Sequence, residues 1–194
     1  MPHADLILAS SSPYRRELLA RLKIPFDVIE PHVDETPHSG ETAEALVKRL
    51  AIAKAQAVAQ NRIQGLVIGS DQVAVHNERI CGKPGNHAEA VRQLQEASGK
   101  TITLFTGLAL VNTATGRVRC EVVPYEVVFR RLTNTQIERY LHKEQPYGCT
   151  GAVRAEGLGV ALLERFAGDD PSALIGLPLI RLVRMLEDEG VQVI

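Results

Sequence analysis

The sequence predicts an α/β fold in which helices flank a mixed sheet. Helical and strand-like patterns alternate along the 194 residues, which is the arrangement expected of an α/β domain. Two long strand patterns, 101–111 and 118–129, are separated by a short turn-rich segment and predict a hairpin within that sheet. No linker, repeat or low-complexity tract interrupts the chain, so residues 1–194 are expected to form a single domain.

The N-terminal segment predicts a strand, a serine-rich loop and a helix. Leu6–Ala9 is a short apolar strand pattern, and three serines and a proline follow it. Ser12 suits the N-cap of a helix and Pro13 its first position, because a hydroxyl can accept an orphan backbone N–H and proline lacks one. The buried face of this helix is expected to consist of Leu18, Leu19 and Leu22.

The next segments predict a long helix and a buried strand. An extended, proline-punctuated stretch over 25–37 leads to a helix over 42–60. The apolar stripe of that helix is predicted at Leu46, Leu50, Ala53 and Ala57. Residues 66–75 predict a buried strand that is interrupted at 69–72, where Gly-Ser-Asp-Gln breaks the apolar run.

The second half of the chain predicts three helices with recognisable ends. They span, in order, 86–97, 133–142 and 178–189. Asn86 with Glu89 and Thr133 with Gln136 suit capping boxes, and Gly190 suits the end of the last helix. Between the helices the sequence predicts a loop at 82–85, a glycine-rich stretch at 148–159 and a strand near 160–164.

Charge and cysteine content exclude several classes of protein. The 22 Lys+Arg and 23 Asp+Glu give a net charge of −1, so no overall field attracts nucleic acid or an anionic membrane. No apolar run approaches the ~20 residues that span a bilayer, and the first residues lack a signal-peptide pattern. The three cysteines are few and far apart in sequence, which suits free thiols. We therefore expect a cytoplasmic protein that binds neither nucleic acid nor membranes.

The loop between the first strand and helix is a candidate anion site. Ser10 and its neighbours offer hydroxyls and backbone N–H groups at the positive end of a helix. Arg15 and Arg16 lie in the first turn, where cations oppose the helix dipole unless an anionic ligand is bound. These features favour a phosphate-binding loop, although the pattern is not a Walker A motif. The alternative is a plain serine cap beside solvated arginines.

Asp71 and Lys54 are charged residues inside apolar patterns. Asp71 interrupts the strand pattern at 66–75, and a carboxylate there needs either a partner or a cleft. It could hold a metal ion or take a proton from water. Alternatively it caps a turn or pairs with a buried cation. Lys54 falls within the apolar stripe of the helix at 42–60, where it is either a ligand for an anion or a lysine whose ammonium reaches solvent.

Two weaker signals point to the same chemistry. Lys83 lies in the loop at 82–85, and Asp34 and Glu35 form an acidic pair in the extended stretch. Cations for a polyphosphate and carboxylates for a divalent ion are the general equipment of phosphoanhydride chemistry. The six histidines are scattered, and neither GxSxG nor GxGxxG occurs as a positioned motif. These absences argue against a zinc hydrolase, an esterase and a dehydrogenase.

Short motifs that combine these residues follow one another along the chain. They are LASSSPYRR at 8–16, VDET at 33–36, AKA at 53–55, GSDQV at 69–73, GKP at 82–84, TG at 106–107, VRAEGLG at 153–159 and GLP at 176–178. With these motifs in this order, the chain resembles the Maf family of nucleoside triphosphate pyrophosphatases essentially from end to end.

The resemblance implies a fold, a reaction and roles for individual residues. The fold would have a strongly twisted mixed sheet and two lobes around an active-site cleft, as in Maf and ITPase proteins. The enzyme would be a cytoplasmic homodimer that uses a divalent cation, Mg²⁺ or Mn²⁺, to split a nucleoside triphosphate into a monophosphate and diphosphate. Asp71 would accept the proton of the attacking water, and Glu35 would help to hold the metal. The phosphates would be bound by Ser10, Arg15, Lys54 and Lys83.

Three further residues match positions that separate the substrate branches of the family. Tyr14, Gln72 and Glu156 are most similar to the branch that acts on 7-methyl-GTP. A cationic 7-methylguanine would gain ~1–2 kcal/mol by stacking on an aromatic ring such as Tyr14, and Glu156 would accept hydrogen bonds from the base. The expected function is removal of 7-methyl-GTP from the nucleotide pool. Two alternatives stay open: the same reaction on UTP or dTTP, and a non-catalytic nucleotide-binding regulator of cell division.

Overall fold

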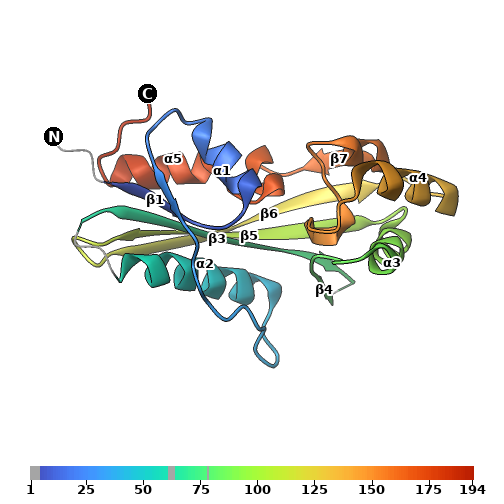
Figure 1. Cartoon of the computed structure of the whole chain (residues 1–194), viewed down its shortest axis with the longest axis horizontal. Coiled ribbons are helices and arrows are strands. Elements are labelled where there is room, and N and C mark those ends of the chain that lie inside the picture. Colours follow the sequence, from blue (N-terminus) through green and yellow to red (C-terminus); the bar gives the residue numbers. More distant parts are fainter. Residues whose placement is uncertain (1–4, 61–63, 78) are drawn as a thin grey trace. The chain divides into compact units, whose positions relative to one another are not determined.

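The computed structural model describes residues 5–60, 64–77 and 79–194, and within them it shows the predicted α/β architecture (Figure 1). The strands are β1 Leu6–Ala9, β2 Asp27–Ile29, β3 Leu66–His76, β4 Arg79–Cys81, β5 Thr101–Asn112, β6 Val118–Phe129 and β7 Leu163–Ala167. The α-helices are α1 Pro13–Ala20, α2 Ala43–Ala59, α3 His87–Ala97, α4 Asn134–Glu144 and α5 Leu179–Asp188. Short 3₁₀ helices are η1 Thr150–Ala152, η2 Leu158–Leu162 and η3 Pro171–Ile175.

The strands form one mixed sheet, as the sequence predicts. Their order is β2-β1-β3-β5-β6-β7, and β4 also pairs with β3. The pairs β1–β2 and β1–β3 are parallel, whereas β3–β4 and β6–β7 are antiparallel. The register places Ala9, the last residue of β1, opposite Gly69 of β3. Ser10 therefore follows β1 at the level where the polar residues of β3 begin.

The chain is organised in two compact units, which we describe separately. Unit 1 contains Met1–Gln72, Thr106–Val123 and Asp170–Ile194, and unit 2 contains Val73–Phe105 and Pro124–Asp169. The long strands β3, β5 and β6 each contribute residues to both units.

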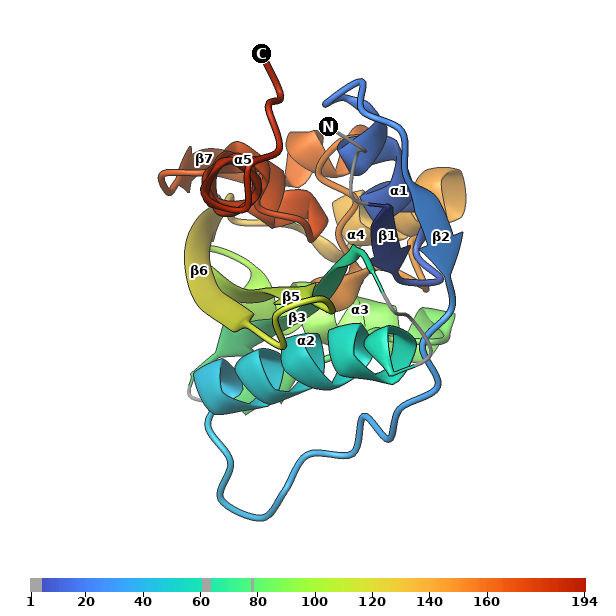
Figure 2. The same cartoon turned by 90° about the vertical axis from the view of Figure 1, so that its left-hand side faces the viewer.

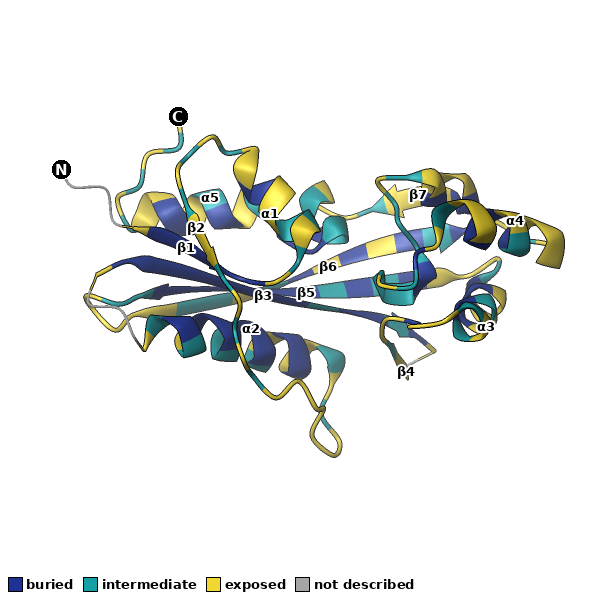
Figure 3. Cartoon of the chain, viewed as in Figure 1, coloured by how far each residue is buried: buried dark blue, intermediate teal, exposed yellow. Residues whose placement is uncertain are grey.

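Unit 1 has helices on both faces of its strands, with α1 and α5 on one face and α2 on the other (Figure 1). Successive residues of a strand point to opposite faces, so β1 contributes to two cores. Leu6 and Leu8 pack in a cluster with Leu18 and Leu19 of α1 and Leu182, Met185 and Leu186 of α5. The intervening Ile7 and Ala9 pack in a second cluster with Ala51, Ala55 and Val58 of α2. The buried strands are dark blue in Figure 3.

Two glycines allow α2 to lie very close to the sheet. A Cβ atom on Gly69 of β3 would lie 2.1 Å from the carbonyl oxygen of Ala51, and one on Gly107 of β5 would lie 2.2 Å from that of Val47. Any side chain at either position would therefore collide with the backbone of α2. The close approach requires glycine at both positions.

Unit 2 is built from the remaining ends of the long strands, β4, β7 and the helices α3 and α4. Helix α3 packs against α4 and η1, and α4 packs against η2. The buried side chains of this unit include Leu94, Leu104, Tyr125, Ile137 and Leu141. Strand β4 pairs with the end of β3, and β7 pairs with β6.

Most element boundaries predicted from capping residues are confirmed. The Ser12 hydroxyl accepts a hydrogen bond from the backbone N–H of Arg15 at the start of α1. Thr133 and Gln136 form the predicted capping box of α4. At α3 the box is only half formed. Asn86 caps the helix, but the Glu89 carboxylate binds Arg92 instead of returning to the cap.

The position of one strand and the buried face of one helix were predicted wrongly, and β2 was not predicted. The strand expected near 160–164 lies at Leu163–Ala167, because η2 occupies the preceding residues. The extended stretch at 25–37 contains the short strand β2, which pairs with β1. The buried face of α2 passes through Ala51 and Ala55 rather than Ala53 and Ala57, which are half-buried, because the close contact with the two glycines selects the face that approaches the sheet.

Candidate functional site

The site in unit 1 is centred on a lysine that contacts two carboxylates. The Nζ atom of Lys54 lies 2.6 Å from Oδ1 of Asp71 and 2.7 Å from Oε1 of Glu35. The side chains of Lys54 and Asp71 are only 8% and 10% exposed, whereas that of Glu35 is 60% exposed. A buried charge is tolerated when it is paired and hydrogen-bonded. Lys54 and Asp71 meet that condition, and Glu35 brings a second carboxylate to the same ammonium.

Strand β3 continues through the polar segment where an interruption was predicted. Gly69 and Asp71 face α2, where the glycine allows the close approach and the aspartate meets Lys54. Ser70 and Gln72 face the other side and bind carbonyl groups there. The predicted interruption at 69–72 is wrong because every polar side chain in it has a partner, so the strand ladder has no reason to break.

Helical spacing explains how α2 delivers Lys54 to this place. Residues three and four apart share a helix face, so Lys54 lies on the same side of α2 as Ala51 and Leu50. Ala51 touches the sheet through Gly69. Lys54 is thereby directed at Asp71, which lies two residues beyond Gly69 on β3. The prediction that Lys54 lies inside the apolar stripe is confirmed, and its ammonium is satisfied by carboxylates rather than by solvent.

The opposite face of β3 and β5 holds the turn η3. The Gln72 amide nitrogen lies 2.9 Å from Oγ1 of Thr106, 2.7 Å from the carbonyl oxygen of Ala173 and 3.3 Å from that of Leu174. Thr106 itself donates to the Ala173 carbonyl at 3.0 Å. Gln72, predicted as a specificity residue, is thus an anchor of η3.

Arg15 is directed into the same region by a carbonyl at the end of η3. Its Nε atom donates to the oxygen of Gly176 at 2.7 Å, and the buried Ser70 hydroxyl lies 2.8 Å from the same oxygen. Burial lowers the pKa of the Arg15 guanidinium, and the negative charges of Asp71 and Glu35 partly oppose that shift. Arg15 therefore lies within electrostatic reach of both carboxylates that contact Lys54.

The serine-rich loop after β1 is held by its own hydroxyls. Ser10, which is 4% exposed, accepts a hydrogen bond from the N–H of Ser12 at 3.1 Å. As an acceptor it keeps its hydroxyl hydrogen for another partner, such as a phosphate oxygen. Tyr14 is half-buried and Arg16 is exposed on α1. The serine cap that the sequence offered as one alternative is present, and it is compatible with the phosphate-binding alternative.

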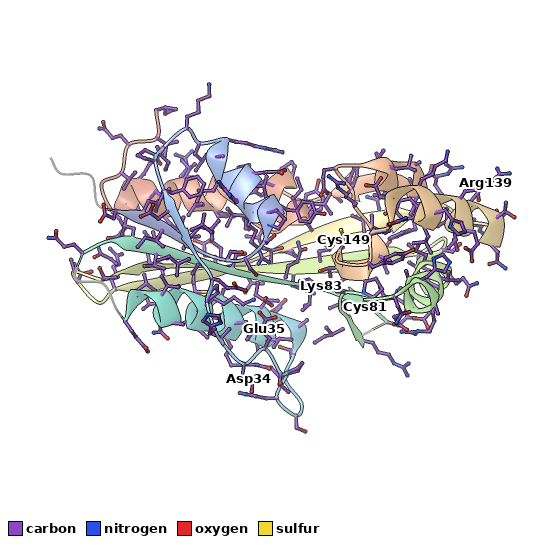
Figure 4. All side chains as sticks on the ribbon, in the orientation of Figure 1. Asp34, Glu35, Cys81, Lys83, Arg139 and Cys149 are labelled. Atoms are coloured by element: carbon purple, nitrogen blue, oxygen red, sulfur yellow. The ribbon has the colours of Figure 1, made fainter. Side chains whose placement is uncertain are left out.

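The two remaining predicted site residues belong to unit 2. Lys83 is exposed in the loop between β4 and α3 (Figure 4). The Glu156 carboxylate lies 3.5 Å from Nε of Arg154, and its side chain is 26% exposed. Helix α4 holds this loop, because the Glu144 carboxylate accepts hydrogen bonds from the Leu158 N–H at 2.9 Å and from Arg154 at 3.2 Å.

The structure thus gathers Arg15, Glu35, Lys54 and Asp71 in unit 1. Sequence reasoning missed Ser70 as the hydroxyl that meets the Gly176 carbonyl. The sequence feature that could have marked Ser70 is its polar side chain within an apolar strand pattern. It also missed Arg49 of α2, which binds Glu41. A charged residue on a helix is ordinarily solvated, so no pattern marked Arg49.

The carboxylates of unit 1 suit a divalent cation that also contacts substrate. Across residues 5–60, 64–77 and 79–194, no three His, Cys, Asp or Glu side chains are grouped so that they could hold a metal ion. Mg²⁺ is commonly bound by one or two carboxylates together with substrate phosphates and water. Asp71 and Glu35, which share one ammonium, offer that number and type of ligand.

Two thiols and the lengths of the helices complete the description of the chain. Cys81 and Cys120 are free cysteines, and burial raises the pKa of Cys120 to about 11. Thiols of raised pKa are poor nucleophiles at neutral pH. Within the described part of the chain, no helix is both long and apolar enough to cross a membrane.

The chain is similar to a family model and to several named proteins. The family model described as Maf-like protein matches residues 5–189. A protein of Nitrosococcus oceani named 7-methyl-GTP pyrophosphatase is 54% identical over 189 residues, which cover 97% of this chain and 95% of that protein. Proteins with the same name from Pseudomonas fluorescens and Pseudomonas aeruginosa are 57% and 53% identical, covering 96% and 97% of this chain and 97% and 98% of their own lengths. The chain belongs to the Maf family.

Proposed function

We propose that this protein is a pyrophosphatase that hydrolyses 7-methyl-GTP to 7-methyl-GMP and diphosphate. Relatives that match nearly the whole chain carry the name 7-methyl-GTP pyrophosphatase. The observation that carries the proposal is the cluster in which Lys54 contacts Asp71 and Glu35. It places a proton acceptor, a cation and a second carboxylate together, which is the set that phosphoanhydride hydrolysis needs.

Asp71 is the general base of the proposed reaction. Its Oδ1 atom is held by the Lys54 ammonium at 2.6 Å, so the carboxylate has a defined orientation. It takes a proton from the attacking water while the water oxygen bonds to phosphorus and the anhydride bond between the α- and β-phosphates breaks. A positioned base of this kind contributes about 10²–10⁴-fold to the rate.

The cations of unit 1 bind the negative charge of the triphosphate. The guanidinium of Arg15 is oriented by the Gly176 carbonyl. The negative charges of Asp71 and Glu35, which Lys54 contacts, also act on Arg15. Ser10 can donate its hydroxyl hydrogen to a phosphate oxygen, and Lys83 is also proposed to bind phosphate. Glu35 and Asp71 would hold a divalent cation, Mg²⁺ or Mn²⁺, which would supply further positive charge to the phosphate oxygens.

Base selection is proposed to involve Tyr14 and Glu156. Stacking on the Tyr14 ring favours the cationic 7-methylguanine, and the Glu156 carboxylate accepts hydrogen bonds from a guanine base. A pyrimidine would leave Glu156 without these donors. Gln72 contributes by anchoring η3.

The test is diphosphate release from 7-methyl-GTP, GTP, UTP, dTTP and CTP in parallel, with Mg²⁺ or Mn²⁺ and with Asp71→Asn as the inactive control. The proposal requires a clear preference for 7-methyl-GTP with 7-methyl-GMP as the second product. Preference for UTP or dTTP would retain the reaction and reject the assignment of the base. Binding without turnover would instead indicate a nucleotide-binding regulator.

The proposal includes a cytoplasmic homodimer, for which the resemblance to the Maf family is the support. Light scattering of the purified protein measures its mass in solution. A mass near twice the 21.2 kDa of the chain is expected, and a mass near that of one chain contradicts the dimer.

A further inference from the structure

The segment between β2 and α2, residues 30–42, carries Glu35 to the site. Figure 2 shows this strap running beside α2 and joining its N-terminal end. Most of its residues are exposed, and the side chain of Glu35 is itself 60% exposed where it meets Lys54. Exposed loops have few contacts that restrain them. The contact between Glu35 and Lys54 therefore depends on whatever holds the strap.

Arg49 of α2 binds the strap at two places. Its Nε and Nη2 atoms donate to the two oxygens of Glu41, each at 2.7 Å, and Nη2 also donates to the carbonyl oxygen of Thr36 at 3.1 Å. One guanidinium thus joins the C-terminal end of the strap to the residue that follows Glu35. Paired N–H donors of arginine match the two oxygens of a carboxylate and fix its orientation.

The strap adds hydrogen bonds of its own around the guanidinium. The Glu41 carboxylate accepts the backbone N–H of His38 at 3.0 Å, and the Asp34 carboxylate accepts that of Thr36 at 2.9 Å. The Glu41 side chain is only 8% exposed. The residues on both sides of Glu35 are therefore tied either to Arg49 or to a neighbouring strap residue.

This arrangement differs from an ordinary surface ion pair. Exposed pairs contribute little because solvent screens them and both side chains lose freedom. Arg92 of α3, which pairs with Glu89 and Glu96, is of that kind, with a side chain 55% exposed. Arg49 is 28% exposed and also binds a main-chain carbonyl. Arg92 is therefore the matched control.

We propose that Arg49 is a positioning residue that holds the strap on α2 and thereby keeps Glu35 beside Lys54. The inference rests on the proposed pyrophosphatase function. Arg49 and Lys54 lie five residues apart on one helix. Arg49 fixes the backbone that carries Glu35, and Lys54 receives the carboxylate. Arg49 itself touches no reacting atom in this scheme.

A double-mutant cycle tests whether Arg49 acts through Glu35. We expect Arg49→Gln to lower kcat/KM for 7-methyl-GTP by roughly tenfold or more, since small misplacements of a site group have effects of this size. In a Glu35→Ala background the same substitution should change kcat/KM by less than about twofold, because coupled residues are not additive. Glu41→Gln, at the other end of the clamp, should behave as Arg49→Gln does. Arg92→Gln should leave activity unchanged.

Amide hydrogen exchange supplies a second readout. The N–H groups of Thr36 and His38 should exchange faster in Arg49→Gln than in the wild type, and the Arg92→Gln protein should exchange as the wild type does. The proposal would be overturned if Arg49→Gln lowered activity equally in the wild-type and Glu35→Ala backgrounds. It would also be overturned if the amide exchange of Thr36 and His38 were unchanged in Arg49→Gln. If the wild-type protein hydrolyses no nucleotide, the proposed function fails, and the exchange data alone decide whether Arg49 holds the strap.

Discussion

Lys54 of α2 and Asp71 of β3 form a buried ion pair with its two atoms 2.6 Å apart. The pair joins a helix to a central strand, and Glu35 adds a second carboxylate to the same ammonium. In the proposed function the charged groups of this cluster serve chemistry as well as charge balance. Variants at Asp71 and at Lys54 therefore separate the two roles.

Asp71→Asn should abolish turnover while the protein stays folded. Asparagine keeps the size of the side chain and an oxygen for Lys54, and Glu35 still balances the ammonium. Without the carboxylate the rate on 7-methyl-GTP should fall by at least ~10²-fold. Steady-state kinetics and a thermal melt on the same sample measure both effects. Near-normal turnover would remove Asp71 from the role of general base.

Lys54→Met should destabilise the protein. It leaves the carboxylate of Asp71 buried without its cation, a loss of about 3–5 kcal/mol in the free energy of unfolding. The double variant Lys54→Met with Asp71→Asn should regain part of that loss, because the buried carboxylate that lacks its cation is then removed as well. Urea unfolding gives the comparison, with Arg92→Met as a surface control expected to change stability by less than about 0.5 kcal/mol. A double variant no more stable than Lys54→Met would contradict this account.

Gly107→Ala should also be destabilising, for a steric reason. The added methyl would lie 2.2 Å from the carbonyl oxygen of Val47, so α2 would have to move away from β5. Overpacking of this kind costs about 1–3 kcal/mol or more. Gly148→Ala is the matched control, because nothing lies within 4 Å of the corresponding Cβ position. Equal unfolding midpoints for the two variants would show that α2 can shift without cost.

Glu156→Gln should change the choice of substrate more than the rate. The variant keeps an acceptor but loses the negative charge that suits a cationic base. We expect kcat/KM to fall more for 7-methyl-GTP than for UTP. The Gln variant also weakens the contact with Arg154, which is 3.5 Å in the wild type, so a thermal melt should accompany the kinetics. Equal losses on both nucleotides would mean that Glu156 does not contact the base.

The lowered pKa of Glu41 predicts how the free energy of unfolding changes with pH. Hydrogen bonds from Arg49 and from the His38 backbone lower the pKa of Glu41 to about 2, from an ordinary value of 4.5. A carboxyl whose pKa is lower in the folded state stabilises that state above its unfolded pKa, and the contribution disappears as the pH falls through the folded value. The wild type should therefore lose stability relative to Glu41→Gln between about pH 4.5 and pH 2. Parallel curves of unfolding free energy against pH for the two proteins would refute the assignment.

The helices were predicted well because the residues that start a helix are close together in the sequence. Ser12, Thr42 and Thr133 each accept a backbone N–H at the start of a helix, and such caps involve residues three apart in sequence. Strand positions depend on partners elsewhere in the chain. That dependence explains why β2 was missed and why β7 lies three residues further on than predicted.

The candidate site was predicted in composition but not in its contacts. Asp71 and Lys54 stood out because charge is costly in an apolar pattern. The alternative in which Asp71 pairs with a buried cation is confirmed, and its role as a functional group stays a prediction. Arg49 and Glu41 gave no signal, since an arginine and a glutamate on a polar segment are usually solvated. Their pairing depends on how the strap meets α2, which no local pattern encodes.

The contacts of Val47 and Ala51 with Gly107 and Gly69 also limit how the length of the chain can vary. One residue inserted into α2 between Ala51 and Lys54 would rotate the lysine by about 100° relative to these contacts and turn its ammonium away from β3. The same insertion in the strap between Thr36 and His38 would leave that angle unchanged. We therefore expect the spacing from Val47 to Lys54 to be intolerant of insertions and deletions, whereas the strap can accommodate them wherever Arg49 still reaches Glu41.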